Sequence, residues 1–136
     1  MSANWTDAIA PSPEDLATLA RAAFDALPPA VRTAAGDVEF HIFEFADDRT
    51  LTDFGIENPF ELSGLYDGVD RLHASLLDPV PQIPRIFLFR RPILDEWAER
   101  GDATLGELVG NIMIHEIGHH MGLSDRDIEE IEAAPE

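Results

Sequence analysis

Apolar residues at helical spacing begin shortly after the N-terminus. Ser12 can cap a helix, Pro13 suits its first position, and Asp15 completes a capping box. Leucine, alanine and phenylalanine side chains then recur every three or four residues as far as Leu27, where two prolines follow. The pattern predicts one helix over this segment and a short helical turn over residues 30–35.

Three short runs of apolar side chains predict strands. Val38 to Phe45 is the clearest, because aromatic and branched residues dominate it. Residues 64–68 form a short strand that enters a tight turn, and residues 86–89 form a short buried strand. Charges, a glycine and a proline mark residues 46–63 as a long loop with one helical turn at Phe60.

Two helices are predicted after the last strand. Pro92 begins the first helix and Gly101 ends it. Thr104 and Glu107 form a capping box for the second, which is expected over residues 105–122. Apolar side chains extend around most of this second helix, which is therefore predicted to be buried. We interpret its three glycines as points where neighbouring backbone approaches closely.

The order of these elements, a helix, then strands, then helices, indicates an α+β fold with N- and C-terminal helices. Residues 1–11 are short, polar and end in proline, so we expect a flexible N-terminal tail. The length of 136 residues favours one domain, over residues 12–136. Its acidic end, residues 127–136, predicts a solvated helical face.

The charge of the chain excludes one class of partner. The net charge is −18, and the nine basic residues are all arginine. Nucleic acid is not an expected partner, because neutralising phosphates requires basic patches. An acidic surface attracts cationic peptides or keeps a protein in solution.

The absence of cysteine restricts the available chemistry. Disulfides and thiolate chemistry are excluded, so a metal would need nitrogen and oxygen ligands.

Residues 1–10 lack the pattern of a signal peptide, and no later apolar run is long enough for a membrane span. We therefore expect a cytoplasmic protein that does not enter a membrane.

Two histidines and a glutamate carry the candidate chemistry. His115 and His119 lie four residues apart near the end of the last predicted helix, with Glu116 between them. On a helix their rings lie about 40° apart around the axis and about 6 Å apart along it, so both can bind one ion. Histidines at this spacing also occur on helices without metal, but the glutamate between them favours a catalytic zinc site. Glu116 is suited to hold the attacking water as general base and to pass its proton to the leaving amine.

A third ligand is expected after the helix. On a continuous helix Asp125 would stand about 9 Å beyond His119 and point away from the ion. A left-handed turn at Gly122 can bring Asp125 back, which gives two nitrogens, one oxygen and a position open to water. Asp125 also fits the first turn of a following helix, and Glu129, Asp127 or a remote acid are alternative ligands.

Other polar side chains have weaker claims to a role. His120 follows Glu116 by one helical turn and could orient it, or could simply be packed. His41 and His73 have no spacing that links them to the site and are interpreted as structural. Tyr66, the only tyrosine, could polarise a substrate carbonyl, but nothing local favours that role over packing.

The motif resembles that of the zincin metallopeptidases in the form H-E-x-x-H-x-x-G-x-x-D, which matches His115, Glu116, His119, Gly122 and Asp125. Further segments look like the small bacterial mini-zincins with a minimal matrix-metalloprotease-like domain: residues 26–29, 64–68, 85–92 and 125–131.

The resemblance implies a compact zincin-like fold, with an active-site helix packed against a small mixed sheet. It also implies peptidase activity on a peptide or protein substrate, with one catalytic Zn²⁺ ion. Larger zincins with this motif have a methionine turn below the metal, whereas no methionine follows Met121 here. The chain is too short for a full C-terminal subdomain, so we expect a shallow cleft and weak or narrowly specific activity. A monomer or weak homodimer is a separate expectation.

Two other functions are alternatives at this point. One is a non-catalytic metal-binding or protein-interaction module on a zincin scaffold. The other is a metal-dependent endoribonuclease, a family that uses H-x-x-x-H-x-x-G-x-x-H spacing without the glutamate. Glu116 and the acidic charge both disfavour the endoribonuclease.

Overall fold

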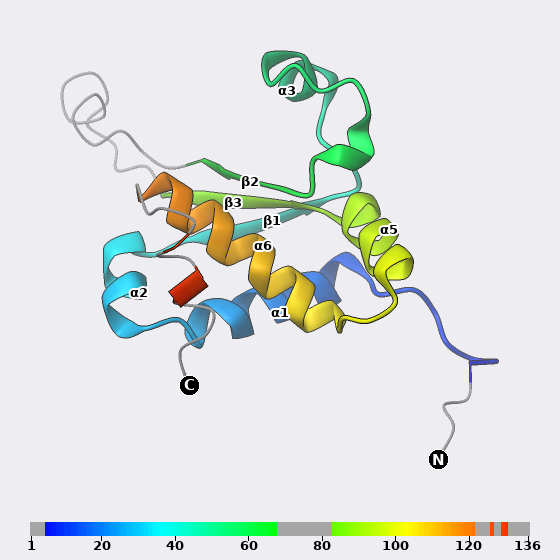
Figure 1. The fold of residues 1–136 in the computed structure, drawn as a ribbon, viewed down its shortest axis with the longest axis horizontal. Coiled ribbons are helices and arrows are strands. Elements are labelled where there is room, and N and C mark those ends of the chain that lie inside the picture. Colours follow the sequence, from blue (N-terminus) through cyan, green and yellow to red (C-terminus); the bar gives the residue numbers. More distant parts are fainter. Residues whose placement is uncertain (1–4, 68–82, 122–125, 127–128, 131–136) are drawn as a thin grey trace.

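The computed structural model describes residues 5–67, 83–121, 126 and 129–130, which form helices around a small sheet (Figure 1). This confirms the predicted α+β class. The helices are α1 (Pro13–Asp25), α2 (Pro29–Ala35), α3 (Asp48–Asp53), α5 (Arg90–Arg100) and α6 (Leu105–His120), with a 3-10 helix η1 (Pro59–Glu61) and strands β1 (Glu39–Phe43), β2 (Gly64–Asp67) and β3 (Arg85–Phe89).

The described strands form one mixed, three-stranded sheet in the order β1-β3-β2. The middle strand, β3, pairs in parallel with β1 and antiparallel with β2. Ile86 of β3 is opposite Phe40 on one side and Tyr66 on the other. The β2 strand therefore forms one edge of the described sheet.

Helices α1 and α6 lie together on one face of this sheet (Figure 1). Helix α1 packs against β1 and α6, and α6 packs against β2. Ile86 and Leu88 of the middle strand are fully buried on this side, because alternate residues of a strand point to the same face. The main core thus lies between the sheet and the two helices, and its buried members are Leu16, Ala20, Phe24, Leu27, Ala35, Val38, Ile86, Leu88, Ile93, Leu108, Val109, Met113 and Ile117.

The opposite face of the sheet carries a smaller cluster. Phe89 packs there with Ala46 and Leu51, which come from the segment that contains α3. Phe43 of β1 stacks on Phe87 and is half exposed. This face is therefore partly covered by the segment between β1 and β2.

Both predicted capping boxes are present. The Ser12 hydroxyl accepts from the Asp15 amide, and the Asp15 carboxylate accepts from the Ser12 amide. Thr104 and Glu107 make the same reciprocal pair at the start of α6. Local hydrogen bonds thus fix where these two helices begin, as the sequence indicated.

One predicted loop contains a helix, and two predicted boundaries are wrong. The segment from 46 to 63 is not only a loop, because Asp47 caps α3 by accepting from the Thr50 amide at 2.8 Å. Hydrogen bonds from the Thr50 side chain and from this amide lower the pKa of the Asp47 carboxyl group from its ordinary value. Helix α5 begins at Arg90 rather than Pro92, and β1 ends at Phe43 rather than Phe45.

The interpretation of the α6 glycines is also corrected. A Cβ atom on Gly106 would lie 3.7 Å from Leu19, and one on Gly110 would lie 3.7 Å from Ala23. Both distances are ordinary van der Waals contacts with side chains of α1. These two glycines therefore face a helix rather than the sheet, and no close backbone approach requires them.

Residues 5–10 extend away from the body of the protein (Figure 1), and Pro11 contacts it. The Arg90 guanidinium donates to the Pro11 carbonyl at 2.7 Å and to the Glu44 carboxylate at 2.8 Å. The division into a tail of residues 1–11 and a domain of residues 12–136 stays a prediction.

Within the part of the chain that the structure describes, no helix has the length and apolar character needed to cross a membrane.

Candidate metal centre

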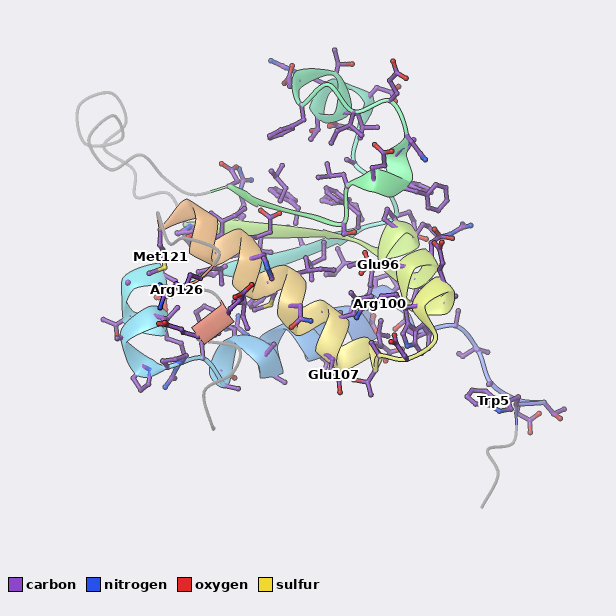
Figure 2. All side chains as sticks on the ribbon, viewed as in Figure 1. Trp5, Glu96, Arg100, Glu107, Met121 and Arg126 are labelled. Carbon is purple, nitrogen blue, oxygen red and sulfur yellow. The ribbon has the colours of Figure 1, made fainter. Side chains whose placement is uncertain are left out.

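Helix α6 carries the two histidines and the glutamate of the motif in its last turns. The helix runs from Leu105 to His120, so the backbone spacing required by the metal hypothesis is met. Met121 directly follows this helix, and it lies at the other end of the molecule from Glu96 and Glu107 (Figure 2). The candidate site therefore lies at the C-terminal end of α6, while the capping box lies at the other end.

The His115 ring is half-buried and is held by its own helix. Its Nδ1 atom lies 2.7 Å from the backbone carbonyl oxygen of Asn111. A carbonyl oxygen only accepts, so Nδ1 must donate its hydrogen. In the neutral ring the lone pair is then on Nε2, the nitrogen that a metal would bind. Metal-binding histidines are commonly held in this way by a hydrogen bond from the other ring nitrogen.

Glu116 is half-buried on the same turn as His115. The next residue, Ile117, and Met113 one turn earlier are buried in the main core. These two apolar side chains anchor this part of α6 against the rest of the protein. The turn that presents Glu116 is therefore held in place by the core.

The remaining members of the predicted ligand set lie outside the described residues. This applies to Asp125 and Gly122, to the alternative ligand Asp127, and to the side chains of His119 and His120. Among the described residues, no group of three or more histidine, cysteine or acidic side chains is arranged to hold a metal. The complete ligand set stays a prediction, and the described alternative, Glu129, is an exposed helical residue.

His41 lies on the face of the sheet that points away from α6 and packs against the neighbouring strand. Its ring is 3.2 Å from the Glu39 carboxylate and packs against Phe87, with ring centroids 5.5 Å apart. Phe40 and Ile42, its neighbours on β1, pack into the main core. Because side chains alternate along a strand, His41 faces away from α6. His73 lies outside the described residues.

Gly64 brings the edge strand β2 close to α6, a contact that the sequence pattern does not predict. A Cβ atom at this position would lie only 2.8 Å from Cγ2 of Ile112, one turn before His115. The available signal was a glycine at the start of a predicted strand, which often marks a close approach of neighbouring groups. The missing side chain therefore sets how closely β2 lies on the helix that bears the motif.

Replacing Gly64 with alanine should destabilise the protein by about 1–3 kcal/mol, the usual cost of overpacking. The added methyl group would overlap Cγ2 of Ile112, which sits on a branched β-carbon and cannot easily turn away. The free energy of unfolding, measured in urea, checks this value. The matched control is Gly110→Ala, whose new methyl group has room beside Ala23. Equal stability of the two variants would contradict the proposed close contact.

One family of known proteins matches this chain. The sequence model of the zincin-like metallopeptidases matches residues 35–134, which include the described strands and the whole of α6. No curated protein matches the chain. The family match confirms the resemblance stated from the motif, and the α+β fold with its small mixed sheet is consistent with a zincin-like fold.

Proposed function

Because the chain belongs to the zincin-like metallopeptidase family, we propose that it hydrolyses peptide bonds with one zinc ion held by His115, His119 and Asp125. The observation that supports this proposal is the His115 ring, whose Nδ1 hydrogen bond to Asn111 places the lone pair of the neutral ring on Nε2, the atom that would bind zinc. The substrate would be a peptide or a protein.

The chemistry of the donor set supports zinc. The chain has no cysteine, so the proposed ligands are two imidazoles and one carboxylate, which leave one position open as catalytic zinc sites do. Zinc, when bound, lowers the pKa of water toward about 7 and withdraws electrons from a carbonyl group. A turn at Gly122 would bring Asp125 to the two histidines.

Glu116 would move the proton in the reaction. It lies between the two histidines in sequence, on the same turn as His115. Its carboxylate would accept a proton from the attacking water and then deliver it to the nitrogen of the leaving amine. His120 would orient this carboxylate through a hydrogen bond.

The family match and the charge both favour this function over the alternatives. An RNA substrate would meet a chain with 27 acidic residues and nine basic ones. A non-catalytic module would bind zinc or a partner without hydrolysing peptides. The following two measurements separate that module from a peptidase.

Protein purified without chelators should contain about one zinc ion per chain, as expected for a catalytic site. His115→Ala and His119→Ala should each lose the ion, because a single imidazole and a carboxylate hold zinc weakly. The matched control is His41→Ala, which changes the same residue type on the opposite side of the sheet and should keep the metal. Zinc analysis by mass spectrometry checks all four proteins. An unchanged zinc content in His119→Ala would refute the proposed site.

Hydrolysis is tested separately with an unfolded protein or a peptide library. The zinc-loaded protein should cleave peptide bonds, and removal of zinc by a chelator should stop cleavage. Stoichiometric zinc without any cleavage would favour the non-catalytic module. RNA cleavage that depends on His119 would instead favour the endoribonuclease.

A further inference from the structure

The side chain of Tyr66 faces α6, and three observations agree on this orientation. Tyr66 is opposite Ile86, which is fully buried on the helix side of the sheet. It follows by two residues Gly64, whose missing side chain faces Ile112 of α6. Tyr66 is itself half-buried and packs against the cluster that contains Met113 and Ile117. Residues two apart on a strand share a face, so the orientation is consistent.

Tyr66 also lies at the level of the turn that bears Glu116. Strand β2 packs on α6, and both run toward the same end of the molecule (Figure 1). Two residues along a strand advance about 6.6 Å. Four residues along a helix advance about 6 Å. Starting from the contact between Gly64 and Ile112, Tyr66 therefore reaches the level of Glu116.

The side of α6 that β2 covers is the side of the candidate site. Around the helix axis, Glu116 lies about 40° from Ile112 in one direction, and His115 lies about 60° from it in the other. A line drawn along the surface of α6, parallel to its axis, from Ile112 toward the C-terminal end therefore passes between Glu116 and His115. Tyr66 comes from the edge strand that follows this line.

We propose that the Tyr66 hydroxyl donates a hydrogen bond to the carbonyl oxygen of the peptide bond being cleaved. The inference rests on the proposed function and adds a substrate-contacting group from β2. Negative charge develops on that oxygen as water attacks, and a fixed donor stabilises the charge. A phenylalanine at position 66 would provide the same packing but has no hydroxyl group. The chain has eight phenylalanines, and Tyr66 is its only tyrosine.

The first test replaces Tyr66 with phenylalanine, which keeps the ring and removes only the hydroxyl. With the zinc-loaded protein, kcat should fall by about 10²–10³-fold, the usual effect of removing one such donor. The KM value, zinc content and unfolding temperature should stay unchanged. The control is Phe43→Leu, on the opposite face of the sheet, which should keep the wild-type kcat.

A second readout does not depend on catalysis. A phosphinic peptide, which imitates the tetrahedral geometry of the reaction, should bind Tyr66→Phe more weakly than the wild type, in proportion to the loss in kcat/KM. Labelling with 3-fluorotyrosine places one fluorine on Tyr66 alone, because the chain has a single tyrosine. Its ¹⁹F resonance should shift when the phosphinic peptide is added to zinc-loaded wild type, and should not shift in His119→Ala.

The outcomes distinguish this inference from the function on which it rests. If the wild type cleaves peptides and Tyr66→Phe has the same kcat and the same phosphinic-peptide affinity, Tyr66 is only a packing residue. A change confined to KM, or a ¹⁹F resonance that does not respond to the bound phosphinic peptide, overturns the inference in the same way. If the wild type holds no zinc and binds no phosphinic peptide, the proposed function and the role of Tyr66 both fail.

Discussion

Glu116→Gln should lower kcat for peptide hydrolysis by about 10²–10⁴-fold, which is the usual contribution of a general base. Glutamine has nearly the same size as glutamate, but its amide does not accept a proton at neutral pH. The zinc content should stay at the wild-type value, because Glu116 is proposed to act on water and not to bind the metal. Measuring kcat and zinc content on the same preparation tests both parts of this prediction.

The matched control for this substitution is Glu96→Gln. Glu96 is also a half-buried glutamate, and it lies on α5 at the opposite end of the molecule from Met121 (Figure 2). Its carboxylate is 3.7 Å from the Arg100 guanidinium, a partly exposed pair whose loss should barely change stability. Equal hydrolysis by wild type and Glu116→Gln would contradict the base assignment. A loss of zinc from Glu116→Gln would instead indicate that this carboxylate is a ligand.

Helix beginnings could be predicted from the sequence because neighbouring residues determine them. The reciprocal hydrogen bonds of Ser12 with Asp15, and of Thr104 with Glu107, join residues only three positions apart. The helical period also placed His115 and Glu116 on one turn of α6 without any knowledge of the tertiary structure. Local periodicity was therefore sufficient for this part of the candidate site.

The sheet order could not be predicted in the same way. The parallel pairing of β1 with β3 joins Glu39 to Arg85, and their separation in sequence leaves no local signal. The close contact of Gly64 with Ile112 likewise depends on how β2 packs against α6. The level of Tyr66 along the helix follows from that contact, so the sequence suggested a possible role for this residue but not its position.

The missed helix α3 and the incorrect start of α5 have different causes. Asp47 and Thr50 form an N-cap pair inside a segment whose charges and glycine favoured a loop. At α5, the sequence predicts Pro92 as the first helical residue, but a proline is also tolerated later in the first turn, where the backbone N–H has no partner within the helix. The helix instead begins directly after β3, and Pro92 becomes a buried residue of its first turn.

Ile86→Ala should reduce the free energy of unfolding by about 2–5 kcal/mol, the range for truncating a fully buried aliphatic side chain. Ile86 is 0% exposed and lies in the middle strand, opposite Phe40 of β1 and Tyr66 of β2. Truncation would leave a cavity between the sheet and α6, where the surrounding strands and helix cannot move together without breaking other contacts. Urea denaturation measures the change.

The control for Ile86 is provided three residues earlier by Ile83, which is 50% exposed. Ile83→Ala removes the same atoms, but about half of that side chain is already in water, so the loss should be below about 1 kcal/mol. The difference between the two variants isolates burial as the cause, since residue type and substitution are identical. Comparable losses in both proteins would mean that the main core does not lie between β3 and α6. The inferred position of Tyr66 beside the turn of Glu116 would then be wrong as well.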